Sequence, residues 1–337
     1  NSTFKQFIRN KIEMYTRSIL IPITFLLLTA CGSKPNSDAA SGDALSGNIN
    51  IDGSSTVYPI TEAVAEEFQK VQPGVKVSVA LSGTGGGFKK FGRAETDIND
   101  ASRPIKPAED SLAKSHNVSY VELTVAFDGM AIVVNPKNDW CKDMTVAELK
   151  MLWEPEAQGK IKNWNQIRPE WPNEEIHLFG AGVESGTYDY FTEVIVGKSH
   201  SSRGDFTASE DDNVLVQGVA SDKYALGFFG LAYFEENKDK LKVIGIDDGK
   251  AENGEGPILP SIETVKNKSY SPLGRPLFIY VNSKAGQRKE VQEFVRFYLN
   301  NTNTLTAEVG FISLTEQESA DAKAKWEAFI TSLPAAQ

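Results

Sequence analysis

One segment decides the fold, Ile49-Asn50-Ile51-Asp52-Gly53-Ser54-Ser55-Thr56-Val57-Tyr58-Pro59-Ile60, because it predicts a strand, a turn and a helix in direct succession. Apolar residues at positions 49 and 51 favour a strand, and from Ile60 apolar residues recur at helical spacing as far as Val71. One glycine and three hydroxyl residues fill the turn between them. Such a turn leaves free backbone N–H groups with the positive end of the helix dipole behind them, which suits an anion.

Two further turns have the same composition and also lie between a strand pattern and a helix pattern. Ser82-Gly83-Thr84-Gly85-Gly86-Gly87 follows the run 75–81, and Glu184-Ser185-Gly186-Thr187 follows the run 176–179. Ser and Thr cap many helices, so a single turn of this kind is explained by capping alone. Three such turns predict that backbone exposed by glycine, together with hydroxyl groups, converges on one oxyanion site.

The first 30 residues have the pattern of a secretory signal peptide. Ile19–Leu28 is an almost unbroken apolar run behind Arg17, and it is shorter than the roughly 20 residues that span a bilayer. The run ends in Leu28-Thr29-Ala30-Cys31-Gly32, which resembles the bacterial lipobox, in which Cys31 becomes the lipidated first residue of the mature protein. The alternative is an ordinary signal cleaved near Ala30, with Cys31 incidental.

Residues 31–47 are expected to form a flexible tether. Small and polar residues dominate this stretch and Leu45 is its only large apolar side chain, so it cannot bury enough surface to offset its ordering entropy. Lipid on Cys31 would then hold a soluble body at a membrane surface, since several acyl chains together give stable anchoring.

The composition restricts the ligand. With 35 Lys and Arg against 45 Asp and Glu, the net charge of −10 argues against nucleic acid or anionic lipid as the ligand, but not against a small anion held by buried dipoles. Lipidation of Cys31 would leave Cys141 alone, so neither an internal disulfide nor a cysteine cluster for a metal is expected. No cofactor is implied.

Beyond the tether, strand and helix patterns alternate along the chain. Val118–Thr124 alternates, Met130–Val134 and Pro276–Asn282 are apolar strands, and Val291–Leu299 has helical spacing. This alternation predicts an α/β fold with mostly parallel strands covered on both faces, and with ligands at the carboxyl ends of the strands.

Seven segments, taken in order, carry a family resemblance. They are Asp52–Pro59, Ser82–Phe88, Asp100–Lys106, Glu184–Phe191, Asp211–Val219, Gly227–Gly230 and Arg275–Val281. No single tetrapeptide among them is specific, but the ordered set resembles the phosphate-binding protein of the bacterial high-affinity phosphate ABC transporter (the PstS family, including its cyanobacterial SphX-like members).

The resemblance implies a type II periplasmic-binding-protein fold, in which two α/β lobes joined by two crossovers close over a ligand in the cleft. Lobe one would comprise residues 48–132 plus 273–334, and lobe two residues 133–272. The implied function is that of a monomeric receptor in the periplasm or on the outer face of the cell membrane, which binds inorganic phosphate and delivers it to an ABC permease. A phosphate-sensing or scavenging protein, a phosphohydrolase on the same fold, and a receptor for another tetrahedral oxyanion remain as alternatives.

The resemblance also carries over the binding residues, which are hydroxyls and backbone groups at helix starts. They are Ser55, Thr56, Val57, Ser82, Thr84, Gly85, Ser185, Gly186 and Thr187. Better-known family members have an acidic residue in an Ala-Ser-Asp turn and an arginine four residues before Ser-Gly-Thr. This chain has Arg103 at the first of these positions and Ala181 at the second. The positive charge that balances the anion is therefore expected to lie in lobe one instead of lobe two.

Arg103 is therefore expected to pair with the bound anion, and a surface salt bridge is the alternative role for its guanidinium. Rejection of sulfate needs an acceptor for the phosphate proton, since sulfate has no proton to donate at neutral pH. The acidic candidates are Asp128, at a predicted strand end, and then Asp189 and Glu184. Asp128 is favoured.

Enzyme motifs are not found. Gly182-Val183-Glu184-Ser185-Gly186 does not match the Gly-x-Ser-x-Gly nucleophile elbow. The chain has 3 histidines, none of them in a candidate turn, and no His/Asp cluster for a metal-dependent phosphatase. We therefore expect no catalytic residues and no metal.

Overall fold

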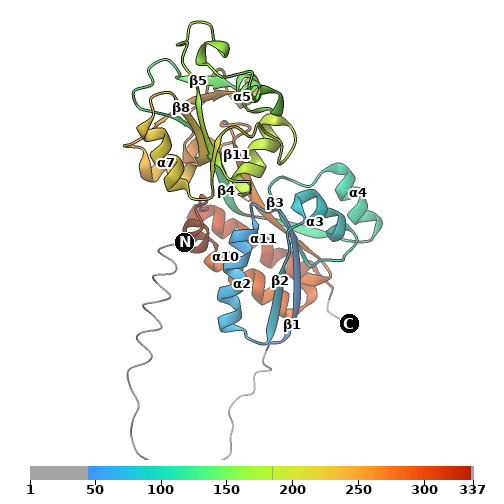
Figure 1. Ribbon diagram of the computed structural model, residues 1–337. Coiled ribbons are helices and arrows are strands. Elements are labelled where there is room, and N and C mark those ends of the chain that lie inside the picture. The colour runs from blue at the N-terminus through green and yellow to red at the C-terminus, as the bar shows by residue number, and fades with distance from the viewer. Residues whose placement is uncertain (1–44, 184, 335–337) are drawn as a thin grey trace, which may run out of the picture. The chain divides into compact units, whose positions relative to one another are not determined.

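The computed structural model describes residues 45–183 and 185–334 (Figure 1). The expected signal peptide, the lipidated Cys31 and most of the tether lie outside these residues. Within the described part of the chain, no helix combines the length and the apolar character needed to cross a membrane.

Strands and helices alternate through most of the body, as the sequence predicts. The strands are β1 (Gly47–Gly53), β2 (Val75–Val79), β3 (Ile98–Ala101), β4 (Tyr120–Val134), β5 (Asp143–Thr145), β6 (His177–Ala181), β7 (Thr207–Ser209), β8 (Ala225–Gly230), β9 (Lys242–Val243), β10 (Gly245–Asp247) and β11 (Gly274–Asn282). The helices are α2 (Tyr58–Val71), α3 (Gly83–Gly92), α4 (Pro107–Ser115), α5 (Val146–Trp153), α6 (Gly186–Phe191), α7 (Asp212–Ser221), α8 (Leu231–Asn237), α9 (Ile262–Lys266), α10 (Lys289–Glu308) and α11 (Glu316–Ser332). A π-helical turn, Thr192–Val196, continues α6.

A mixed sheet runs through the body in the order β2-β1-β3-β11-β4-β8-β6-β7, with β9 also paired to β4. Its two ends are parallel, because β1 pairs in parallel with β2 and β3, and β6 with β7 and β8. In the middle, β4 and β11 run antiparallel to each other and to their outer neighbours. The expectation of mostly parallel strands is therefore correct only at the two ends of the sheet.

Strand β4 belongs to two halves of this sheet. Residues 120–129 pair with β11, whereas residues 130–134 pair with β8. We call β2, β1, β3, β11 and residues 120–129 the first half-sheet, and residues 130–134 with β8, β6, β7 and β9 the second half-sheet. The sequence predicts two separate strands here, with Asp128 at a strand end. The structure has one strand, because pairing with β11 continues through residue 129 and pairing with β8 begins at residue 130, so Asp128 lies within the strand, opposite Arg275 and ion-paired to it.

Each half-sheet is covered by its own helices and has its own core. On the first half-sheet, α2 and α10 pack together on one face and α3 and α4 lie on the other (Figure 1). A separate core under the second half-sheet includes Phe191 and Phe228, whose rings stack with centroids 3.9 Å apart, and Trp153 packs edge-on against both. Burial of such large aromatic side chains supplies much of the stabilisation of a core.

Candidate functional site

A cavity of about 290 Å³ lies where the first two glycine- and hydroxyl-rich turns meet α6. It is lined by Ser54, Ser55, Thr56, Gly83, Thr84, Gly85, Ser102, Arg103, Lys106, Asp189, Tyr190, Glu193, Ser199 and Arg275. Five of the residues predicted for the site are among them, namely Ser55, Thr56, Thr84, Gly85 and Arg103. Turns far apart in the chain therefore do converge, although not every predicted residue faces the cavity.

The first turn is held in place by the end of β3. Gly53 has φ +142°, and a Cβ on it would lie 2.1 Å from the carbonyl oxygen of Asp100, so a larger residue could not turn here. The next backbone N–H, that of Ser54, donates to the same carbonyl at 3.0 Å. This arrangement brings Ser55 and Thr56 to the cavity wall, whereas Val57, which is also predicted for the site, is fully buried and does not line the cavity.

The second turn places the start of α3 beside the first. Ser82 does not line the cavity, and its backbone N–H instead donates to Asp52 Oδ1 at 2.9 Å. Thr84 does line it, with Oγ1 3.0 Å from Ser102 Oγ. The first N–H groups of a helix have no intrahelical acceptor, so the amino end of α3 offers backbone donors next to these hydroxyls.

The described residues of the third turn, 185–187, pack against the first turn and do not line the cavity. Ser185 caps α6, since its hydroxyl accepts a hydrogen bond of 3.2 Å from the N–H of Thr187. A Cβ on Gly186 would lie 3.1 Å from Thr56 Cα, so the two turns are in close contact. The part of α6 that reaches the cavity is its next turn, with Asp189 and Tyr190.

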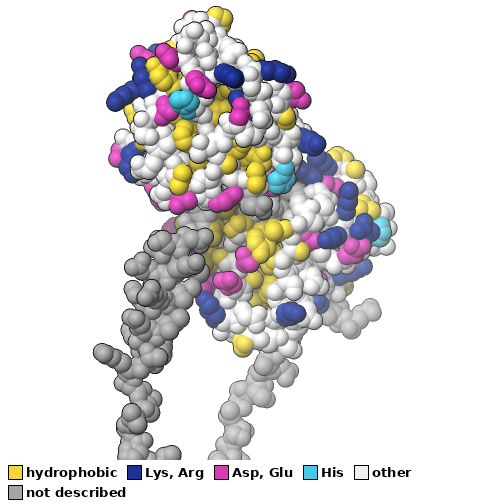
Figure 2. All heavy atoms as spheres, in the orientation of Figure 1, with side chains coloured by type: hydrophobic (Ala, Val, Ile, Leu, Met, Phe, Trp, Pro, Cys, Tyr) yellow, Lys and Arg dark blue, Asp and Glu magenta, His cyan; other side chains and the backbone are white. Residues whose placement is uncertain are grey.

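Arg103 lines the cavity, but its guanidinium is paired with Glu109 on α4. Nη1 and Nη2 donate to the two carboxylate oxygens of Glu109 at 2.9 and 2.8 Å. This bidentate geometry is the strongest form of side-chain ion pair. The salt-bridge role considered as the alternative for Arg103 is thus present, and Glu109 offsets the charge that was expected to face the anion. Lys and Arg side chains (dark blue in Figure 2) also gather around α3 and α4, interspersed with acidic ones.

Arg275 was not assigned to the site from the sequence, yet its side chain is more deeply buried than that of Arg103. Its side chain is 11% exposed, and Nη2 donates to Thr56 Oγ1 at 2.9 Å. Its guanidinium carbon lies 3.2 Å from the ring centroid of Tyr190 on α6. The sequence did offer a reason to consider Arg275, since it is the first residue of Arg275–Val281, one of the segments that carry the family resemblance. Its position at the cavity, however, depends on the pairing of β11 with β4.

The two acidic candidates within the described residues differ in position. Asp128 is 5% exposed, does not line the cavity and lies beside Arg275. Burial raises the pKa of Asp128, and the neighbouring Arg275 opposes that shift. Asp189 lines the cavity and accepts hydrogen bonds from Ser55 Oγ at 2.8 Å and Ser199 Oγ at 2.9 Å. Glu184 lies outside the described residues.

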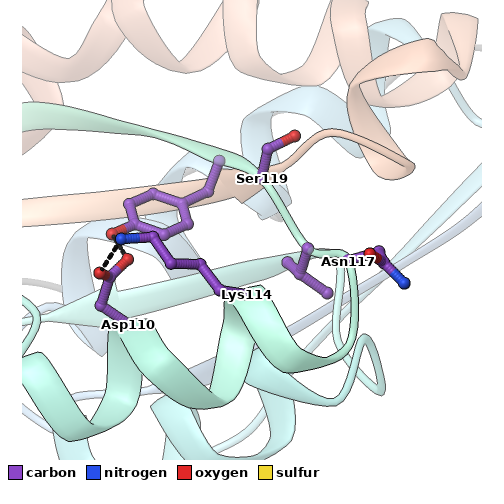
Figure 3. Close-up of a pocket in the computed structure, with 6 residues that line it drawn as sticks. Asp110, Lys114, Asn117 and Ser119 are labelled. Carbon is purple, nitrogen blue, oxygen red and sulfur yellow. Dashed lines mark hydrogen bonds and ion pairs between the residues drawn. The ribbon is translucent and has the colours of Figure 1, made fainter.

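A larger hollow, of about 760 Å³, lies away from these turns beside α4 (Figure 3). It is lined by the consecutive stretch 117–120 together with Asp110 and Lys114, which form an ion pair of 2.6 Å with each other. None of the three glycine- and hydroxyl-rich turns contributes a described residue to its lining, so we do not assign it a ligand. Across residues 45–183 and 185–334, no group of three or more His, Cys, Asp or Glu side chains is arranged to hold a metal ion.

Comparison with known proteins identifies one matching family model and relatives that are similar over most of the chain. The family model of the PBP superfamily domain matches residues 38–302. Protein SphX from Synechocystis is 50% identical over 299 residues, 88% of this chain and 85% of the relative. Phosphate-binding protein PstS from Staphylococcus saprophyticus is 38% identical over 308 residues, 90% of this chain and 91% of the relative.

A crystal structure is also similar, that of a possible phosphate binding protein from Planctomyces limnophilus. It has a TM-score of 0.81 and 46% sequence identity, and the match covers 85% of this chain and 99% of that one. The expected α/β fold of the type II periplasmic-binding-protein class is thereby confirmed. The chain belongs to the PBP superfamily and, within it, to the family of the PstS and SphX phosphate-binding proteins.

Proposed function

We propose that this chain is an extracytoplasmic receptor that binds inorganic phosphate and delivers it to an ABC permease without chemical conversion. The observation that carries the proposal is the cavity in which hydroxyls of two turns, the amino end of α3 and the Arg275 guanidinium converge. The names of its relatives, phosphate-binding protein PstS among them, support the choice of ligand.

A buried phosphate dianion needs nearly complete hydrogen bonding, because its desolvation otherwise costs many kcal/mol. In this proposal Ser55, Thr56, Thr84 and the backbone of Gly85 donate to the phosphate oxygens. Arg275 supplies the counter-charge and Arg103 contributes from the rim. Ser185, Gly186 and Thr187 would complete the coordination from the opposite side when the cleft closes.

Closure requires two bodies that move relative to each other. We propose that these are the lobes expected from the sequence, residues 48–132 plus 273–334 and residues 133–272. The separate cores of the two half-sheets support this division, as does the fact that β4 pairs with both halves. The hydrogen bond between Ser55 and Asp189 and the stacking of Arg275 on Tyr190 would then connect the lobes.

The remaining features of the proposal concern the location of the protein. We infer that the chain is monomeric, with a signal peptide at residues 1–30 and a lipid on Cys31 that anchors it to the outer face of the cell membrane. The sequence pattern of residues 17–32 supports this part of the proposal.

Isothermal calorimetry with phosphate, arsenate and sulfate tests the function. Stoichiometric, saturable binding of phosphate with weaker binding of sulfate is expected. A phosphomonoester assay run in parallel should release no phosphate above the uncatalysed rate. Catalytic release would favour the phosphohydrolase alternative, and preferential binding of sulfate or molybdate would favour a receptor for another oxyanion.

A further inference from the structure

Asp52 connects the first two glycine- and hydroxyl-rich turns. It is the residue before Gly53 at the end of β1, and its side chain is 3% exposed. Its Oδ1 accepts hydrogen bonds from the N–H of Gly53 at 2.7 Å and from the N–H of Ser82 at 2.9 Å. One carboxylate oxygen therefore holds the first residue of each of these two turns.

The other carboxylate oxygen of Asp52 binds the far end of α3. Oδ2 accepts a hydrogen bond from Nζ of Lys90, which lies in the last turn of this helix, whereas Ser82 is its N-cap. Burial raises the pKa of Asp52, but the hydrogen bonds from Lys90 and from the two turns lower it overall. Asp52 is thus a buried, ionised carboxylate bonded to residues at both ends of α3.

Among the described residues, no backbone hydrogen bond joins the two turns directly. The pairing of β1 with β2 ends with a bond of 2.9 Å from the N–H of Ala80 to the carbonyl oxygen of Ile51, before either turn begins. The turns are nevertheless packed closely, because a Cβ on Gly87 would lie 2.7 Å from Gly53 Cα. The side chain of Asp52 therefore provides the hydrogen-bonded link between them.

We propose that Asp52 is a positioning residue for phosphate, which holds the first two turns at the spacing of the bound anion before the anion arrives. This proposal rests on the proposed function, because the turns belong to the anion cavity. Asp52 does not line the cavity, so it acts through the turns and not by contact with the ligand. Binding is stronger when the donors are already in place, because ordering them does not then reduce the free energy of association.

Asp52→Asn tests the proposal, because the ammonium group of Lys90 determines how the new amide turns. Lys90 attracts the amide oxygen, so the amide nitrogen, which is a donor, faces the two backbone N–H groups and the bridge is lost. Phosphate affinity measured by calorimetry should fall by about tenfold, as it does when only about a tenth of the molecules hold the turns in place. Amide hydrogen exchange at Ser82 in the unliganded protein should become about tenfold faster.

Lys90→Met added to Asp52→Asn should restore the bridge, because the amide oxygen can then face the two backbone N–H groups. Phosphate affinity should return to within about threefold of the parent, and exchange at Ser82 should become slow again. The loss of a positive charge would by itself weaken the binding of an anion further. Recovery of affinity in the double variant therefore identifies the bridge as the cause.

Asp97→Asn is the matched control and should leave phosphate affinity within about twofold of the parent. Asp97 likewise accepts a hydrogen bond from the backbone of β1, of 2.8 Å from the N–H of Asn50, and pairs with Arg288 at 2.7 Å. Asn50 lies in the strand before the first turn, so this carboxylate supports β1 without joining the two turns. A general loss of stability would affect both aspartate variants, whereas loss of the bridge affects only Asp52→Asn.

The outcomes separate this proposal from the proposed function. If the parent binds phosphate and Asp52→Asn binds it as tightly, the bridge does not position the turns and the phosphate receptor stands. The proposal is also wrong if the folded double variant remains as weak as Asp52→Asn. If Asp52→Asn does not fold, the double variant decides, since parent-like affinity with slow exchange at Ser82 supports the bridge and a tenfold loss contradicts it. If the parent binds no phosphate, the proposed function is wrong and this inference is overturned with it.

Discussion

Arg275 and Asp128 face each other across the antiparallel strands β11 and β4, and Nε and Nη2 of the arginine both lie 3.3 Å from the same carboxylate oxygen. These distances exceed the 2.7–2.9 Å typical of a tight charge-assisted hydrogen bond. The guanidinium also donates to the carbonyl oxygen of Ser102 at 3.5 Å and to Thr56 Oγ1 at 2.9 Å, and the contact with Thr56 is the shortest of the four. The guanidinium is thus held loosely by its acidic partner and directed at the first turn, which suits a group that pairs with a bound anion.

Arg275→Met should weaken phosphate binding by at least tenfold, because the loss of one partner of a buried charge-assisted contact costs roughly 2–5 kcal/mol. Arg103→Met, for which the sequence alone predicts the same loss, should cost less, since Glu109 already neutralises Arg103. Calorimetric titration of both variants measures the difference. Arg168→Met serves as the control, because Arg168 pairs with Glu148 away from the cavity. A larger loss of phosphate affinity for Arg103→Met than for Arg275→Met would show that Arg103, and not Arg275, is the main cation that pairs with the bound phosphate.

Asp189→Asn should raise the ability of sulfate to compete with phosphate by about tenfold, because the new amide can donate to an oxyanion that has no proton of its own. The sequence favours Asp128 as the acceptor of the phosphate proton, but of the two aspartates only Asp189 lines the cavity, where it already accepts from Ser55. Asp128→Asn should therefore have the smaller effect on discrimination. Competition calorimetry with both anions decides between the two residues, and unchanged discrimination in the Asp189 variant would exclude it as the acceptor.

Asp100 should make the protein less stable as the pH rises. Burial, opposed by the Thr61 hydroxyl and aided by Asp52, raises the pKa of Asp100 from 3.8 to about 8. The folded state therefore binds one more proton than the unfolded state between these pH values, so the free energy of unfolding falls by up to about 1.4 kcal/mol per pH unit as the pH rises through that window. Urea unfolding between pH 5 and pH 9 measures this slope.

Asp100→Asn should flatten the pH dependence, because the amide does not titrate. Asp239→Asn removes an exposed carboxylate and should leave the slope as it is. Equal slopes in the parent and in the Asp100 variant would show that another group is responsible.

Gly186→Ala should weaken phosphate binding by about fivefold or more, because the added methyl group would overpack the contact with Thr56. Its Cβ would lie 3.1 Å from Thr56 Cα, whereas a Cβ on Gly230 would meet no atom within 4 Å, which makes Gly230→Ala the matched control. Small-angle scattering should show that the parent contracts on binding phosphate and that Gly186→Ala contracts less. Identical contraction in both would mean that the two turns do not approach further on closure.

Cys31→Ser should release the protein from membranes and leave phosphate affinity unchanged, because the acyl chains, and not the body, hold it there. Membrane fractionation, with calorimetry on the released protein, measures both properties. If the serine variant fractionates with membranes as the parent does, the lipobox interpretation is wrong.

The sequence by itself determined the local parts of this protein. Strand, turn and helix follow one another around Gly53 and Ser54 as predicted, because alternation, helical spacing and glycine in a tight turn are properties of neighbouring residues. The α/β class and the family follow from the order of such segments. Helix α2 has the predicted buried face at Ile60, Val64 and Phe68, although Val71 at its end is 57% exposed.

Only the tertiary structure decided which charges face the cavity. Arg103 lies six residues before Glu109 and pairs with it, whereas Arg275 reaches Asp128 across 147 residues of chain through the register of β11 on β4. Ser55 likewise meets Asp189 across 134 residues. The strength of an ion pair depends on distance and burial, and these are set by strand pairing and helix packing that no local pattern contains. Sequence patterns could therefore locate the turns, while the partners of the charged groups became known only from the folded chain.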